Sequence, residues 1–171
     1  LNKTAYMFYD LYTLTSIEGI ENLNVSEITS TECMFYGCRS IDNLDFSESF
    51  NNTNINNLKS MFDGCSSLSV LNVQWLNTYH AVNMEGMFDG CSSLEILDIT
   101  KFDTSYVTNM NYMFYNCSSL KTIYVGSGFS VDKAIGSEMF KNCINLVGEK
   151  GTKYSWNHID IDYAHIDNRM F

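Results

Sequence analysis

The eight-residue stretch MFDGCSSL occurs twice in this chain without change, at residues 61–68 and at residues 87–94. It belongs to a longer series in which Met-Phe is followed by cysteine, three residues after the phenylalanine. A degenerate copy starts at Met7, where Leu11 takes the place of the cysteine. Successive copies are 26 or 27 residues apart, and a fixed period across most of a chain predicts a stack of repeated units. The complete copies start at Met34, Met61, Met87, Met113 and Met139.

The residues that follow each cysteine have the apolar spacing L-x-x-L-x-L of a leucine-rich repeat. In the unit that begins at Cys91, these residues are Leu94, Leu97 and Ile99. The triplet at 97–99 alternates between apolar and polar residues, which predicts a short strand. We expect the strands to form a parallel sheet along one side of the stack, with right-handed connections. Matching triplets occur at residues 44–46, 71–73 and 123–125, and a weaker one occurs at 17–19.

The second half of each unit changes to a helical period. Met110, Met113, Phe114 and Cys117 have the spacing i, i+3, i+4, i+7, which predicts one face of a helix of about two turns. The residue before each cysteine of the series is Gly or Asn, and these residues adopt positive φ more readily than others. We interpret this position as the left-handed residue that ends each helix. The five residues concerned are Gly37, Gly64, Gly90, Asn116 and Asn142.

These patterns predict an α/β fold: a leucine-rich-repeat solenoid of about five to six units of 26–27 residues, with a parallel sheet on one side and short helices on the other. We assign residues 1–147 to the repeat array and residues 148–171 to a C-terminal cap segment that is continuous with it. In this segment Ile159, Ile161 and Tyr163 alternate with polar residues, which predicts a strand. Calcium binding by the tail is the alternative, but the glycine and terminal glutamate of an EF-hand loop are missing. The chain opens almost inside the helix of the first unit, which indicates a fragment or a processed protein.

Five of the six cysteines form one column, with one cysteine in each unit. Neighbours in such a column lie roughly 5 Å apart with parallel Cβ directions, whereas a disulfide needs a Cβ–Cβ distance of about 3.5–4.5 Å. We therefore predict free, buried thiols that act as small apolar side chains. A soft metal is the alternative, but thiolates along a line do not make a tetrahedral site. Cys33 lies outside the column, and we expect it to be a surface or edge thiol. The column consists of Cys38, Cys65, Cys91, Cys117 and Cys143.

The composition argues against several classes of function. The formal net charge is −10 and no basic cluster is present, which excludes nucleic acid as an expected partner and disfavours anionic membrane surfaces. No apolar run approaches the roughly 18 residues that a membrane span needs, so we expect no membrane insertion. The three histidines, His80, His158 and His165, form no catalytic pattern, and no nucleophile elbow, P-loop or zinc-protease motif occurs. We expect a non-enzymatic protein without a cofactor or a metal.

The unit as a whole reads MFxGCSSLxxLDxSxFDTSxVTNMxxMF, and residues 87–117 match this pattern best. The pattern resembles the 26-residue repeat of bacterial surface proteins, the BspA-like leucine-rich repeats. The same repeat occurs in a domain of unknown function first named from mycoplasma lipoproteins. The resemblance covers about residues 5–147, and residues 151–167 resemble the segment that often follows the last repeat. It implies a cell-surface or secreted protein of bacteria or protists, with adhesion or host binding in some members, and it supplies no catalytic residues.

Candidate binding residues lie on the outward face of the predicted strands. In a repeat array this face is a common binding surface, although charged residues on a solvated sheet need no ligand. The expected row consists of Asp45, Asn72, Asp98 and Tyr124, flanked by Glu95. Trp75, Tyr79 and Tyr106 are candidate aromatic anchors, because the repeat does not require aromatic residues there and Trp and Tyr are enriched at binding hot spots. Covering the edge of the core is the alternative role for them.

We therefore expect a binding module that displays one face to a protein or glycan on a host or neighbouring cell. The alternative is a structural stalk that presents another domain of a longer surface protein. A binding face should consist of residues that differ between units, whereas a stalk should repeat the same exposed residues. The sequence leaves the oligomeric state open.

Overall fold

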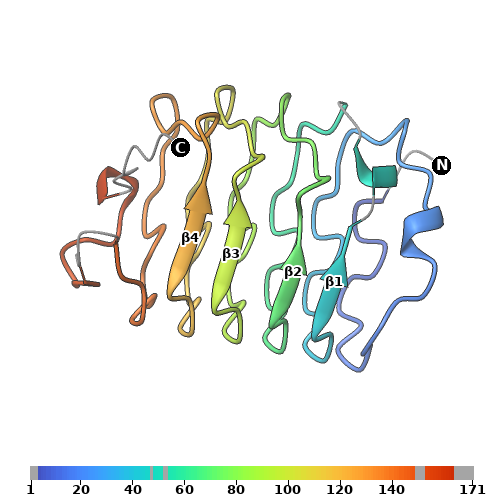
Figure 1. Ribbon diagram of the computed structural model, residues 1–171, viewed down its shortest axis with the longest axis horizontal. Helices are drawn as coiled ribbons and strands as arrows, with labels where there is room; N and C mark the ends of the chain where they lie inside the picture. The colour runs from blue at the N-terminus through green and yellow to red at the C-terminus, as the bar shows by residue number, and fades with distance from the viewer. Residues whose placement is uncertain (1–3, 47, 52–53, 149–152, 164–171) are drawn as a thin grey trace.

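The computed structural model describes residues 4–46, 48–51, 54–148 and 153–163. Figure 1 shows one solenoid, in which the chain winds through successive units that stand side by side from the N-terminal to the C-terminal end. Four short strands lie next to one another on the side nearest the viewer. The predicted leucine-rich-repeat architecture is therefore present, and each unit contributes one layer to the stack.

The strands are β1 (Asn43–Asp45), β2 (Val70–Asn72), β3 (Ile96–Ile99) and β4 (Thr122–Val125). They pair in parallel, β1 with β2 and β3 with β4, as the alternating triplets predicted. The inward residue of each pair occupies the same register, as with Leu97 and Ile123. The weaker triplet at 17–19 is not a strand; a 3₁₀ helix, η1 (Ile20–Asn22), follows it after Gly19, whose φ is 80°.

The side opposite the strands differs from the prediction, because the described residues contain no α-helix there. The stretch that was expected to be helical is a run of overlapping turns. The amide of Met113 donates to the carbonyl of Met110 at 3.2 Å, whereas the amide of Phe114 donates to Met139 of the next unit at 3.0 Å. Alternate amides thus close local turns or join neighbouring units. A helix would use these amides internally, and the i, i+3, i+4 spacing does not separate the two cases, because four-residue turns also return side chains to one face.

The Gly/Asn position before each cysteine has positive φ in all five units, as predicted, but it closes a turn rather than ending a helix. The φ angles are 70°, 74°, 68°, 57° and 66° for Gly37, Gly64, Gly90, Asn116 and Asn142. A second column of positive φ lies four residues earlier, and its composition gave no signal. It consists of Tyr6, Cys33, Ser60, Gly86, Tyr112 and Glu138. Cys33 was expected to be a surface or edge thiol; it is only 9 % exposed, so the surface position was wrong.

The core consists of columns that run the length of the stack. One phenylalanine from each unit stacks on the next, with ring centroids between 5.2 Å and 5.7 Å apart. The cysteine column runs beside it, and all six cysteines are buried and free in the structure. Each thiol of the column donates to a phenylalanine carbonyl of the preceding unit, as Cys117 does to Phe88 at 3.0 Å. Burial raises the pKa of Cys143 to about 12, which keeps its thiol protonated and able to donate.

The tail contains no strand within residues 153–163. A 3₁₀ helix, η3 (Ile161–Tyr163), occupies the end of this segment, and Lys153 forms an isolated antiparallel bridge with Val147. The predicted strand at 159–163 was therefore wrong. The rest of the expected cap, including His165, lies outside the described residues, and the boundary between 147 and 148 stays a prediction. A third short helix, η2 (Glu48–Phe50), lies in the loop after β1.

Candidate binding face

The predicted row of outward residues lies along the exposed side of the four strands. Asp45 pairs in register with Asn72, and Asp98 pairs with Tyr124. The side-chain amide of Asn72 donates to Asp45 at 2.8 Å. The side-chain amide of Gln74 donates to the carbonyl of Asp98 at 3.2 Å, which links the segment just after β2 to β3. The structure therefore brings the four predicted residues together in one row.

The carboxylate of Asp98 is held in its ionised form. Its Oδ1 accepts hydrogen bonds from the backbone amide of Thr100 at 3.0 Å and from the Thr100 hydroxyl at 2.7 Å. Partial burial raises the pKa of Asp98, but the bonds from Thr100 and Gln74 and the charge of Lys101 outweigh burial, so the pKa lies below its ordinary value. This end of the row therefore carries a fixed negative charge at neutral pH.

A second polar row runs along the start of the strands. Here Glu95, the remaining predicted residue, forms an ion pair with Lys121 at 2.7 Å, and both side chains are more than half exposed. Such an exposed pair contributes little stability, at most about 1 kcal/mol. Asp42, two units earlier, is exposed, and its carbonyl accepts the amides of Ser69 and Val70. The two rows thus border the sheet with acidic side chains on both sides.

Between these rows lies a stripe that the sequence analysis missed. Val70 is 56 % exposed and Ile96 is 54 % exposed. They stand two residues before Asn72 and Asp98, and residues two apart in a strand point to the same face. The same alternation could have identified them, but only one outward residue was counted for each strand. In β4 the residue that pairs with Ile96 is Thr122, so the aliphatic stripe ends at β3, and Tyr124, with 51 % exposure, belongs to the neighbouring row of Asp98.

The aromatic candidates lie on the loops beyond the strands and divide into two sets. Tyr79 and Tyr106 lie with His80 in one cluster; the ring of Tyr79 is 4.8 Å from His80 and 6.1 Å from Tyr106. The ammonium group of Lys133 stands over the Tyr106 ring at 5.1 Å. Trp75 is 43 % exposed, but among the described residues no recorded ring contact joins it to this cluster. Among the described residues the three predicted anchors therefore do not form one aromatic cluster.

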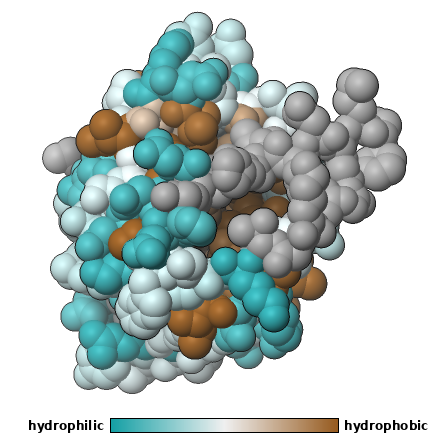
Figure 2. All heavy atoms as spheres, turned by 90° about the vertical axis from the view of Figure 1, so that its left-hand side faces the viewer, coloured by the Kyte–Doolittle hydropathy of each residue, from teal (hydrophilic) through white to brown (hydrophobic). Residues whose placement is uncertain are grey.

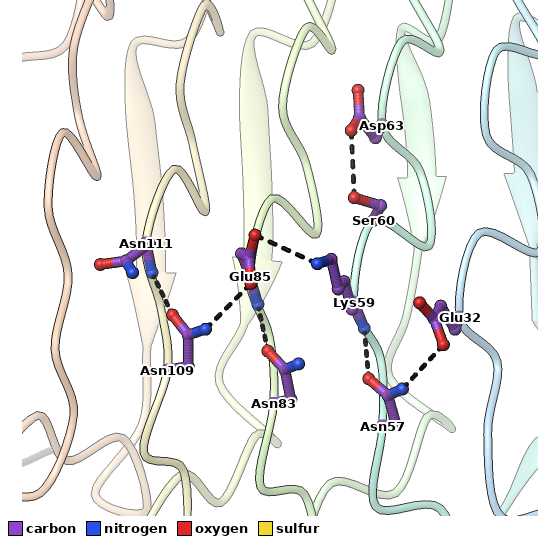
Figure 3. Close-up of polar contacts among 9 residues, drawn as sticks. All are labelled: Glu32, Asn57, Lys59, Ser60, Asp63, Asn83, Glu85, Asn109 and Asn111. Atoms are coloured by element: carbon purple, nitrogen blue, oxygen red, sulfur yellow. Dashed lines mark hydrogen bonds and ion pairs between the residues drawn. The ribbon is translucent and has the colours of Figure 1, made fainter.

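A third set of polar residues holds the units together rather than offering a surface (Figure 3). The side chains of Asn57, Asn83 and Asn109 occupy equivalent positions and each accepts the backbone amide two residues later. Asn109 also donates to Glu85 at 3.0 Å, and Glu85 forms an ion pair with Lys59 at 3.2 Å. These groups satisfy one another across unit boundaries, so we assign them to register and not to ligand binding.

Two half-buried carboxyls lie in the turns of the central units. Burial raises the pKa of Asp63 to about 6, against the hydrogen bond that the Ser60 hydroxyl donates to it at 3.1 Å. Burial, with a further contribution from Asp63, raises the pKa of Asp89 to about 7. Both residues belong to the MFDGCSSL motif, and the sequence analysis assigned them no role. Among the described residues no ion pair is recorded for either of them.

Two features were not found in the described part of the chain: a metal-holding cluster and a membrane-spanning helix. No group of three or more His, Cys, Asp or Glu side chains is placed to hold a metal ion there. The same residues include no helix with the length and apolar character required to cross a bilayer. The arrangement is that of a surface with a variable row of outward side chains.

Comparison with known proteins gives a family and a set of similar folds. The profile of a family described as "Mycoplasma protein of unknown function, DUF285" matches residues 2–124 and, in an overlapping match, residues 42–149. No curated protein shows significant similarity. A leucine-rich cell surface protein from Faecalibacterium prausnitzii, known from a crystal structure, is 17 % identical with a TM-score of 0.48, over 71 % of this chain and 36 % of that one. A leucine-rich repeat protein from Bacteroides ovatus is 22 % identical with a TM-score of 0.48, over 72 % of this chain and 31 % of that one. The chain thus spans about a third of the length of these two proteins.

Proposed function

Since the chain belongs to the DUF285 family, whose description assigns no activity, we propose from its geometry that it is a non-enzymatic binding module. The observation that supports this proposal is the strand face, where outward residues differ from unit to unit. The position of Asp45 is occupied by Asn72, Asp98 and Tyr124 in the other units. A stalk needs no such variation, whereas a binding face draws its specificity from it.

The partner that this face suits best is a protein segment that carries both apolar and basic side chains. Val70 and Ile96 offer aliphatic surface in the middle of the face, and burying the exposed half of each contributes roughly 1 kcal/mol. The flanking carboxylates of Asp42, Asp45 and Asp98 favour positive charge in the partner and disfavour negative charge. A glycan partner is the second candidate of the sequence analysis, and the described strand face offers it only Tyr124 as an exposed ring.

We also propose that the module is displayed on a cell surface or secreted. The support is the resemblance of its unit to the repeat of bacterial surface proteins. On this proposal the role is adhesion or recognition of a neighbouring cell, with the rigid stack holding the strand face in a fixed shape.

The test is a binding screen of the whole chain against host surface proteins, extended peptides rich in Lys and Leu, their acidic counterparts, and glycans. We expect a basic, apolar peptide or protein to bind, with an affinity that falls as salt rises. Ile96→Ser should weaken binding at least about fivefold, which corresponds to roughly 1 kcal/mol. Ile144→Ser is the matched control, because Ile144 is 60 % exposed and lies outside the strands. A screen in which nothing binds would favour the stalk alternative. An equal loss of binding in both variants would mean that the strand face is not the site.

A further inference from the structure

The loops that follow the strands form one edge of the solenoid, which is the upper edge in Figure 1. Two threonines hold three neighbouring loops in register. The Thr78 hydroxyl donates to the carbonyl of Asp103 at 2.9 Å and accepts the amide of the same residue at 2.8 Å. The Thr104 hydroxyl bonds to Ser130 of the next loop in the same way, at 2.6 Å and 2.7 Å. Both threonines are buried, so the three loops form one connected platform.

This platform carries aromatic and basic side chains, which we name the loop cluster: Tyr79, His80, Tyr106 and Lys133. Three of them come from successive units. The ring of His80 lies 6.4 Å from that of Tyr106, at 39° to it, and the ammonium group of Lys133 stands over the Tyr106 ring at 5.1 Å. Tyr79 is 50 % exposed and Tyr106 is 51 % exposed. The loop cluster therefore presents ring surface and polar groups together to solvent.

The polar groups of the platform are already bonded, whereas those of the loop cluster are not. The carboxylate of Asp103 accepts the amide of Ser105 at 2.9 Å and its hydroxyl at 2.6 Å. The carboxylate of Asp132 accepts the hydroxyl of Ser130 at 3.0 Å. Within the described residues, the two phenol hydroxyls, the imidazole and the ammonium group of the loop cluster make no hydrogen bond or ion pair. These groups are therefore available to a ligand.

We propose that the loop cluster is a second binding site, outside the strands, for a neutral, unbranched saccharide chain. The C–H face of a hexose packs on an aromatic ring, and its hydroxyls need both donors and acceptors, which the phenol, imidazole and ammonium groups supply. An extended chain of hexoses repeats at nearly the spacing of the units, so successive sugars fit along His80, Tyr106 and Lys133. A neutral chain is favoured over an acidic one, because the carboxylates of Asp103 and Asp132 lie in the same loops.

A peptide fits the loop cluster less well than it fits the strand face. The strand face exposes the aliphatic side chains of Val70 and Ile96, whereas the loop cluster consists of rings and polar groups. Figure 2 views the stack from its C-terminal end, and the upper rim, which the loops form, shows hydrophilic and weakly polar residues rather than hydrophobic ones. The loop cluster therefore offers less apolar surface to the apolar side chains of a peptide.

The test is a titration of the whole chain, followed by NMR, with neutral β-1,4-linked pentaoses of glucose and of mannose. The free monosaccharides and the acidic pentaose of galacturonic acid are the comparison ligands. We expect a neutral pentaose to bind more tightly than any of these, and Tyr106→Ser to weaken its binding at least about fivefold. Tyr124→Ser is the matched control, because Tyr124 is also 51 % exposed but lies on the strand face. Both variants should keep the native melting temperature.

Three results would overturn the proposal: neither neutral pentaose binds, Tyr106→Ser binds as well as the native chain, or Tyr124→Ser loses as much affinity. Tighter binding of the acidic pentaose would overturn the assignment of a neutral ligand. The basic, apolar peptides of the first screen separate this proposal from that of the strand face. Ile96→Ser should weaken binding of the peptide and leave that of the pentaose unchanged. Peptide binding that is lost in Tyr106→Ser would instead assign the loop cluster to a protein partner.

Discussion

The two ends of the solenoid carry the same motif in different surroundings. Met7 and Met139 occupy equivalent positions, yet Met7 is 41 % exposed and Met139 is 0 % exposed. Leu11 and Cys143 differ in the same way, with 47 % and 0 % exposure. The difference comes from the tail, which covers the last unit, while no described residue covers the first. In a stacked array the burial of a side chain is thus a property of the neighbouring unit rather than of the motif itself.

The largest difference in stability should be found between a substitution at the centre of the stack and the same substitution at its N-terminal end. Phe88 is fully buried between Phe62 and Phe114, whereas Phe8 is half-buried and, among the described residues, stacks on Phe35 alone. Phe88→Ala should lower the free energy of unfolding by about 3–5 kcal/mol, and Phe8→Ala by about 1–2 kcal/mol. Urea unfolding followed by circular dichroism measures both. Equal losses would mean that the first unit is covered as fully as the fourth.

A smaller difference in stability should be found between substitutions at the C-terminal edge and at the N-terminal edge of the stack. In the last unit the amides of Phe140 and Asn142 donate to the tail, to the Ile159 carbonyl at 2.7 Å and to the Tyr154 hydroxyl at 3.2 Å. Ile161→Asp should release the tail from these amides and cost about 1–2 kcal/mol, with faster hydrogen exchange at Phe140 and Asn142. Leu11→Asp places a charge where the side chain already faces solvent and should change stability by less than about 0.5 kcal/mol. A larger loss of stability for Leu11→Asp than for Ile161→Asp would contradict the difference between the two ends.

The central units should make the stability of the chain depend on pH, whereas the end units, which have no carboxyl at the equivalent position, should not. The position of Asp63 and Asp89 is occupied by Tyr9, Tyr115 and Lys141 in end units. The folded-state pKa values of about 6 and about 7 lie above the unfolded value of about 3.9. The folded state therefore binds more protons between pH 4 and pH 7, and stability is lost as pH rises through this window.

At pH 8, where both carboxyls are charged, Asp89→Asn should stabilise the chain by about 1 kcal/mol after allowance for the remaining solvent exposure. At pH 4.5 the same change should be nearly neutral. Glu48→Gln, at an exposed position in η2, is the control. Unfolding curves at the two pH values test this, and a gain that is independent of pH would contradict the assigned cause.

Thiol reactivity compares the two ends with the smallest expected change in stability. Cys143 is buried and its pKa is raised to about 12, so it should react with Ellman's reagent only on unfolding. Leu11→Cys introduces a thiol at the equivalent position of the open end and should react rapidly while leaving stability within about 0.5 kcal/mol of the native chain. Slow reaction of the new thiol would show that the first unit is covered in solution.

The sequence predicted the parts of this fold that depend on repetition. The period, the parallel strands, the cysteine column and the positive φ at the Gly/Asn position all follow from residues that recur in each unit. The helices were wrong because turns and helices share the spacing of Met110, Met113 and Phe114. Cys33 was misplaced because its column of positive φ holds a different residue in almost every unit, so no residue type marks it.

The candidate site was predicted only in part, for a related reason. The row from Asp45 to Tyr124 could be read from strand alternation, and Val70 and Ile96 could have been read from the same rule. The contacts of the tail could not be read, because Tyr154, Asp160 and Ile161 lie outside the repeat. Their partners are backbone amides, which no sequence pattern identifies.

The most direct test of the difference between the ends is to add one more unit before the first. A copy of residues 55–80 placed directly before Leu1 would bring the amides of its residues 60, 62 and 64 to the carbonyls of Ala5, Met7 and Tyr9. In the chain itself these amides bind the equivalent carbonyls of the following unit at 2.7–3.0 Å. The melting temperature should rise by about 5 °C or more, and a matched copy that carries Phe62→Asp should give no rise. Identical melting temperatures for the two fusions would contradict the claim that a neighbouring unit is what buries the core positions of each repeat.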